Sequence, residues 1–115
     1  MTDYLKKFRL DEKTAFVIGG LGLIGWEVSV AFASAGAKTI ILDQNSRKGA
    51  VFKKEVGEVG NDVLFRAFDC GEMENLDQNF SNLLDEFGSP NIYVNCSYPR
   101  TEDWGKSSFR EVNLI

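Results

Sequence analysis

A glycine-rich segment near the N-terminus has the residue types and the spacing of a phosphate-binding turn. Residues 17–25 read Val-Ile-Gly-Gly-Leu-Gly-Leu-Ile-Gly, so the glycines follow a G-x-G-x-x-G pattern and also a G-x-x-G-x-x-G pattern. One glycine would permit a tight turn, a second would let a pyrophosphate approach the backbone, and a third would let the next helix pack closely. Free N–H groups at that helix N-terminus attract phosphates. The pattern predicts dinucleotide contacts from Gly19, Gly20, Leu21, Gly22, Leu23, Ile24 and Gly25; the alternative is a tight turn without a ligand.

An acidic residue follows the next apolar run, 18 residues beyond Gly25, at Asp43. A carboxylate at this place accepts hydrogen bonds from the adenosine ribose hydroxyls. It also repels a 2′-phosphate, which favours NAD over NADP as the cofactor. Arg47 and Lys48 lie just downstream, where they would reach a 2′-phosphate, and they weaken that preference. The alternative is that Asp43 is a simple turn or helix-cap residue.

Composition excludes several other kinds of site. The chain has 13 Lys and Arg against 17 Asp and Glu, a net charge of −4 without a basic tract, so we expect no nucleic-acid partner. It contains no histidine, which excludes catalytic triads that need one and metal sites built on imidazole. No metal site is expected.

The two cysteines, Cys70 and Cys96, lack C-x-x-C spacing, and reduced thiols in a cytosolic protein are favoured over a disulfide. No run approaches the roughly 18 apolar residues of a membrane span, so no membrane partner is expected. Residues 1–10 alternate charged and apolar residues and lack the apolar core of a signal peptide. We therefore expect a cytoplasmic protein.

The elements that must position these residues alternate strictly. Short apolar runs predict strands at 14–18, 38–43, 63–68 and 91–95. Helices are expected at 23–35, from Asn45 or Ser46 to about Val59, and over the apolar stripe Met73, Leu76, Phe80, Leu83, Leu84 and Phe87. Ser108 and Glu111 form a capping box that predicts a further, incomplete helix from about residue 108.

Strands joined through helices indicate parallel pairing with right-handed crossovers. The fold class is therefore α/β, a Rossmann-like doubly wound parallel sheet of about four strands in the order 3-2-1-4. A chain of 115 residues has room for one such domain, spanning residues 1–115.

Residues 10–25 resemble the opening of a short-chain dehydrogenase/reductase, and further landmarks of that family follow at fitting intervals. Asp43 matches the acid after the second strand. Asp69-Cys70 resembles the Asp-Val pair that contacts the adenine ring. Asn95-Cys96-Ser97 resembles the start of the family's Asn-Asn-Ala-Gly segment, which lines the nicotinamide-ribose side. The resemblance implies that these residues, too, bind an NAD(P) cofactor.

The sequence departs from the family pattern at several positions. Ile18 stands in place of a threonine, and Cys96-Ser97 replaces Asn-Ala. The common spacing would place a glycine at Leu23, whereas the middle glycine here is Gly22, as in the branch that acts on nucleotide sugars.

Residues 95–105 are similar to a narrower group of bacterial dehydrogenases associated with flagellin glycosylation and surface-polysaccharide sugar synthesis. The alternative is that Tyr98-Pro99-Arg100 forms a rigid loop after a strand, with Trp104 packed beneath it.

The family's chemistry needs a Tyr-x-x-x-Lys pair, and this chain does not contain one. Four residues after its tyrosines, Tyr4, Tyr93 and Tyr98, stand Phe8, Ser97 and Glu102. Family members run to roughly 250 residues. The chain is therefore interpreted as an N-terminal half that lacks catalytic residues, with a strand edge open for self-association.

Three functions remain in competition. The first is the cofactor-binding part of an oxidoreductase whose full-length parent transfers hydride on a sugar or nucleotide sugar. The second is a non-catalytic nucleotide-binding or interaction module whose sheet a partner completes. The third is a fragment of a nucleotide-sugar epimerase or dehydratase, which the G-x-x-G-x-x-G spacing suggests.

Overall fold

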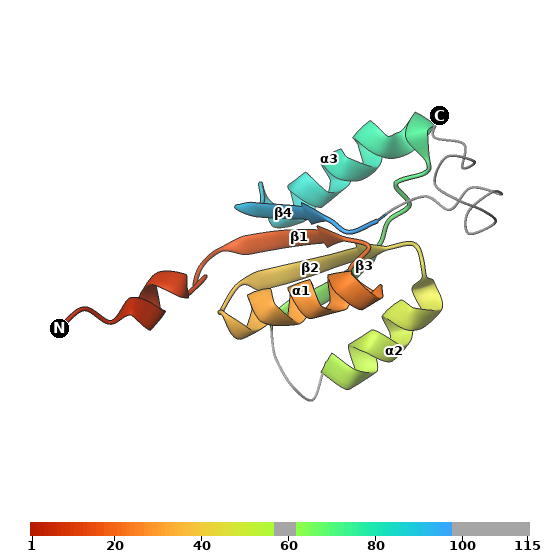
Figure 1. Ribbon diagram of the computed structural model, residues 1–115. Coiled ribbons are helices and arrows are strands. Elements are labelled where there is room, and N and C mark those ends of the chain that lie inside the picture. Colours follow the sequence, from red (N-terminus) through yellow and green to blue (C-terminus); the bar gives the residue numbers. More distant parts are fainter. Residues whose placement is uncertain (57–61, 98–115) are drawn as a thin grey trace, which may run out of the picture.

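The computed structural model describes residues 1–56 and 62–97 (Figure 1). Strands and helices alternate along the chain after a short N-terminal 3-10 helix. The elements are η1 (Tyr4–Phe8), β1 (Thr14–Ile18), α1 (Leu23–Ser34), β2 (Lys38–Asp43), α2 (Ser46–Val56), β3 (Val63–Ala67), η2 (Met73–Asn75), α3 (Leu76–Phe87) and β4 (Ile92–Asn95). The expected end of the second helix and everything from Tyr98, including the capping box, lie outside the described residues.

The strands form one parallel sheet in the order β3-β2-β1-β4, which confirms the predicted class and strand order. Phe16 of β1 pairs with Ile40 on one side and with Tyr93 on the other. The central strands are apolar throughout because both of their faces are covered, and Phe16, Ile40 and Ile41 are fully buried. Within the described residues, β4 has a strand partner on one side only.

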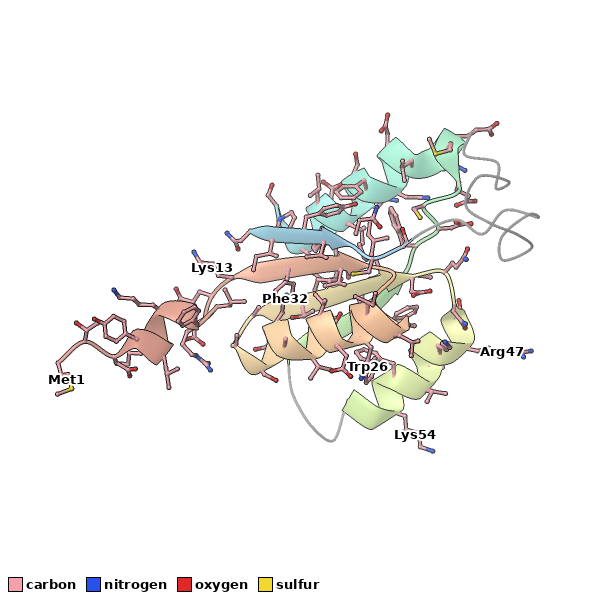
Figure 2. The ribbon with its side chains drawn as sticks, viewed as in Figure 1. Met1, Lys13, Trp26, Phe32, Arg47 and Lys54 are labelled. Atoms are coloured by element: carbon pink, nitrogen blue, oxygen red, sulfur yellow. The ribbon has the colours of Figure 1, made fainter. Side chains whose placement is uncertain are left out.

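Helices cover both faces of the sheet, with α3 on one side and α1 and α2 on the other (Figure 1). On the α3 side, Phe16 contacts the rings of Phe80 and Phe87 at centroid distances of 6.3 and 6.2 Å. On the opposite side, Trp26 of α1 packs edge-on against Phe52 of α2 at 5.2 Å (Figure 2). Strand residues alternate between the two faces, so the sheet separates two apolar clusters.

The third helix begins later than the apolar stripe predicts. Met73 lies in the 3-10 turn η2, before α3 begins at Leu76, and its side chain is 73% exposed. The cause is the turn that follows β3, where Asp69 accepts hydrogen bonds from Gly71 N and Glu72 N. As a result, Met73–Asn75 form the 3-10 helix η2 and not the first turn of α3.

Candidate functional site

The glycine turn connects β1 to α1 and adopts the conformation that the sequence predicts for it. Gly19 has φ of +72°, a value that glycine tolerates and other residues rarely adopt. Its N–H donates to the Leu42 carbonyl at 2.7 Å, which ties the turn to β2. Gly22 is the N-cap of α1, and its carbonyl accepts from Trp26 N at 2.9 Å. The N–H groups of the first turn of α1 have no intrahelical partner.

The individual glycines differ in what a side chain would meet. A Cβ at Gly25 would lie 2.1 Å from the Gly19 carbonyl oxygen, and one at Gly20 would lie 2.7 Å from Ile41 Cγ2. A Cβ at Gly19 would lie 2.9 Å from Ser97 N. At Gly22, by contrast, the nearest atom is the Gly19 oxygen at 3.4 Å, an ordinary contact. Packing alone therefore does not require a glycine at position 22, because a Cβ there would make only an ordinary contact.

Asp43, the last residue of β2, lies beside the glycine turn. It is partly buried at the tip of β2, where its Oδ2 accepts from Leu21 N at 3.2 Å and its Oδ1 accepts from Asn45 N at 3.0 Å. The carboxylate therefore supports the glycine turn and the loop before α2 at the same time. Each carboxylate oxygen still has capacity to accept a further hydrogen bond from a ligand hydroxyl.

The ends of β3 and β4 form the remaining wall. Phe68 N donates to the Asp43 carbonyl at 3.0 Å, and Cys96 N donates to the Ile18 carbonyl at 2.8 Å. Beyond these points, Cys70 Sγ lies 3.4 Å from Ser97 Oγ, so the segments that follow β3 and β4 touch each other.

A cavity of about 650 Å³ lies between these four strand ends. Several residues singled out in the sequence line it together: Gly19, Gly22, Asp43, Asp69, Cys70, Cys96 and Ser97. The sequence reasoning missed Gln44, Gly71 and Met73, which also line it. All three come after the carboxyl end of a strand, and that position alone was a signal that could have identified them.

The other predicted residues do not line the cavity. Gly20, Leu21 and Gly25 are buried behind the turn, whereas the side chains of Leu23 and Ile24 are 93% and 72% exposed on the first turn of α1. Asn95 lies at the end of β4 and accepts hydrogen bonds from Ser97. In this geometry these residues shape or support the site.

The ionisable groups whose pKa is displaced do not themselves line this cavity. Burial raises the pKa of the Tyr93 hydroxyl, and the nearby Cys70 thiol acts in the same direction. Hydrogen bonding from the Arg66 guanidinium lowers the pKa of Glu86, and this pair borders a second cavity of about 570 Å³ between β3 and α3. Over residues 1–56 and 62–97, no cluster of His, Cys, Asp and Glu would hold a metal ion.

The cavity lining consists of glycine backbone, the carboxylates of Asp43 and Asp69, and uncharged polar and apolar side chains. This lining suits the binding of an elongated ligand that carries phosphate at the glycine turn and hydroxyl groups at Asp43. In the described part of the chain, no helix is both long enough and apolar enough to cross a membrane.

Comparison with known proteins shows the family to which this chain is similar. Residues 13–101 match the model of the short chain dehydrogenases. Post-translational flagellin modification protein A of Campylobacter coli is 27% identical over 105 residues, which are 90% of this chain and 41% of that protein. Sorbitol dehydrogenase of Cereibacter sphaeroides is 32% identical over 87 residues, which are 76% of this chain and 33% of that protein.

Solved structures agree with the fold. A gluconate 5-dehydrogenase from Burkholderia cenocepacia, crystallised with NADP and tartrate, superposes with a TM-score of 0.74 and 26% identity. The match covers 86% of this chain and 39% of that one. The chain thus spans about two fifths or less of the length of the relatives named here.

Proposed function

Because the chain belongs to the short-chain dehydrogenase family, we propose that its strand-end cavity binds the adenosine diphosphate part of a nicotinamide dinucleotide. The observation that carries this proposal is the position of Gly22: it lies at the N-terminus of α1, it lines the same cavity as Asp43, and packing would tolerate a Cβ there. When bound, the cofactor supplies hydride chemistry. The residues of this chain bind and orient it through backbone N–H groups, the Asp43 carboxylate and the walls after β3 and β4.

Calorimetric titration with NAD and with ADP-ribose tests this function. We expect both ligands to bind with similar affinity, because ADP-ribose keeps the groups that the cavity addresses. Gly22→Val should abolish binding, since its side chain would fill the space of the pyrophosphate. Absence of heat at millimolar ligand would remove the proposal.

We propose NAD rather than NADP as the preferred cofactor. Asp43 faces the glycine turn, where its charge would oppose a 2′-phosphate. Arg47 lies in the first turn of α2, where its side chain extends outward from the helix (Figure 2), and it does not line the cavity. Titration with both dinucleotides checks the preference, and Asp43→Ala should narrow the difference between them. Tighter binding of NADP than of NAD would contradict this assignment.

For the full-length parent we propose hydride transfer on a sugar or nucleotide-sugar hydroxyl or carbonyl group. Its support is the similarity to the flagellin modification protein, together with sorbitol and gluconate dehydrogenases among the relatives. The chain as given holds no Tyr-x-x-x-Lys pair, and we propose that it binds cofactor without turnover. Steady NADH production by this chain from NAD and a polyol would refute that inactivity.

Specific observations favour each of two alternative functions. The glycines at 19, 22 and 25 fit a nucleotide-sugar epimerase or dehydratase as parent. In the described part of the chain, one side of β4 has no strand partner, which fits an interaction module. The same edge leads us to propose self-association through β4. Recovery of a stable heterologous partner from the native host would favour the module. We place the protein in the cytoplasm, where its free cysteines, Cys70 and Cys96, would stay reduced.

A further inference from the structure

Two positions where the sequence departs from the family pattern touch each other across the cavity. Cys70 stands where the resemblance places valine, and Ser97 stands where it places alanine. Their side chains meet with Sγ and Oγ 3.4 Å apart, and both residues line the cavity. Cys70 belongs to the segment after β3 and Ser97 to the segment after β4, so the contact joins these two walls of the cavity.

The hydrogen bonds around Ser97 fix the direction of this contact. Asn95 Oδ1 accepts from Ser97 N at 2.9 Å, so this atom must be the amide oxygen. The same oxygen lies 2.6 Å from Ser97 Oγ and accepts the only hydroxyl proton of that side chain. Ser97 Oγ therefore has only lone pairs left for Cys70, and the thiol must be the donor.

The backbone beside Ser97 also contacts the glycine turn. A Cβ at Gly19 would lie 2.9 Å from Ser97 N and 3.0 Å from the Cys96 carbonyl carbon, so these segments already pack at their closest approach. The segment after β4 is thus held against the phosphate-binding turn on one side and hydrogen-bonded to Cys70 on the other.

We propose that Cys70, Ser97 and Asn95 form a directed hydrogen-bond relay that sets the separation of the two walls, with Cys70 and Ser97 as positioning residues for the dinucleotide. The proposal rests on the proposed function, because it names the residues that hold the cofactor cavity at its working width. In this relay the thiol donates to the serine hydroxyl, which donates to the asparagine amide oxygen.

A double-mutant cycle on the intact chain tests the relay, with Cys70→Val and Ser97→Ala alone and combined. Calorimetry would measure NAD affinity, urea unfolding would measure stability, and circular dichroism would confirm that every variant is folded. We expect each single variant to weaken NAD binding about three- to tenfold, the range for one lost hydrogen bond. The double variant should be no weaker than Ser97→Ala alone, because Ser97→Ala already removes the contact with Cys70 together with the hydrogen bond to Asn95.

Two further variants separate positioning from general packing. Cys70→Ser keeps a hydrogen-bond donor and should restore most of the NAD affinity that Cys70→Val loses. Ser81→Ala, which removes an exposed hydroxyl of α3, should leave NAD affinity and stability unchanged.

Additive losses in the cycle, or wild-type affinity in the folded Cys70→Val variant, would overturn the relay. If the unaltered chain fails to bind NAD, the proposed function and the positioning role both fall. In that case, non-additive changes in the free energy of urea unfolding would still show that Cys70 and Ser97 are in contact in the folded chain. The unfolding data therefore distinguish failure of the contact from failure of NAD binding.

Discussion

At the scale of single residues, two glycines of the same motif, Gly25 and Gly22, differ in whether packing leaves room for a side chain. Gly25 has no side chain because the turn and the helix touch there, with the Gly19 carbonyl oxygen 2.1 Å from a would-be Cβ. Gly22 has no side chain although the protein leaves room for one. Folding therefore requires a glycine at position 25, whereas under the proposed function Gly22 serves the ligand.

This difference predicts opposite outcomes for two alanine variants. Gly25→Ala should lower the free energy of unfolding by about 1–3 kcal/mol or more, because the new methyl group forces the helix away from the turn. Urea denaturation followed by circular dichroism measures the loss. Unchanged stability in Gly25→Ala would show that the close contact is not maintained in solution.

Gly22→Ala is the matched variant. Its backbone has φ of −75°, which alanine adopts without strain, so its stability should stay within about 1 kcal/mol of the original, the range for an N-cap change. Its affinity for ADP-ribose should fall at least about tenfold, or roughly 1.4 kcal/mol, because the methyl group occupies the approach of the pyrophosphate. Equal binding by the two proteins would mean that the ligand does not lie against Gly22.

At the scale of the elements, β3 and α3 are joined by an ion pair on the edge of the sheet. Arg66 Nε lies 2.9 Å from Glu86 Oε1, and Arg66 Nη2 lies 2.5 Å from Glu86 Oε2. The guanidinium also lies 5.1 Å from the centroid of the Phe87 ring. Both partners are partly exposed to solvent, so the pair makes a modest contribution that depends on salt and on pH.

The pH dependence of this pair has a definite sign. Arg66 lowers the pKa of Glu86 in the folded chain, so the pair stabilises the fold above the unfolded-state pKa of about 4.3 and loses that effect as pH falls through the folded value. Glu86→Gln should therefore reduce stability at pH 7, with a difference that disappears at low pH. Thermal unfolding across pH 3–7 checks this.

Asp85→Asn provides the control, since it removes an exposed negative charge from the same helix. Its effect should lack the pH profile of Glu86→Gln. Identical profiles for the two variants would show that the net charge of α3, and not the ion pair, decides the result.

The elements also show what the sequence could and could not predict. The strands and the helices followed from apolar runs and stops such as Gly36 and Gly88, because a parallel sheet covered on both faces needs continuous apolar strands. The start of α3 was wrong, since helical spacing from Met73 onward says nothing of the turn that Asp69 builds first. Local hydrogen bonds override periodicity at such boundaries.

The placement of the candidate site residues was predictable to a similar extent. The motif located the turn between β1 and α1, and the strand end located Asp43, which lines the same cavity. The contact between Cys70 and Ser97 was not predictable, because it depends on the segments after β3 and β4, which are far apart in the sequence. Pairing of that kind leaves no local signal.

At the scale of the whole molecule, helices cover both faces of the sheet, and among residues 1–56 and 62–97 no strand pairs with the outer edge of β4. Tyr93 of β4 is 48% exposed, whereas Phe16, its partner in β1, is fully buried. An edge strand with unpaired N–H and C=O groups is a template for pairing with another chain.

This geometry predicts association that depends on protein concentration. Sedimentation velocity over a range of concentrations should show a dimer or larger species that dissociates on dilution, because pairing at one edge is bimolecular. A compact monomer at every concentration would contradict self-association through β4.

The central claim is that the cavity at the strand ends binds the adenosine diphosphate part of a dinucleotide. Titration of ADP-ribose into the isotopically labelled chain, followed by amide NMR shifts, tests it most directly. The account predicts saturable shifts at the glycine turn, Asp43, the segment after β3 and Ser97, with η1 unaffected and no such shifts in Gly22→Val. Absence of shifts at millimolar ADP-ribose, or shifts confined to residues outside the cavity, would contradict it.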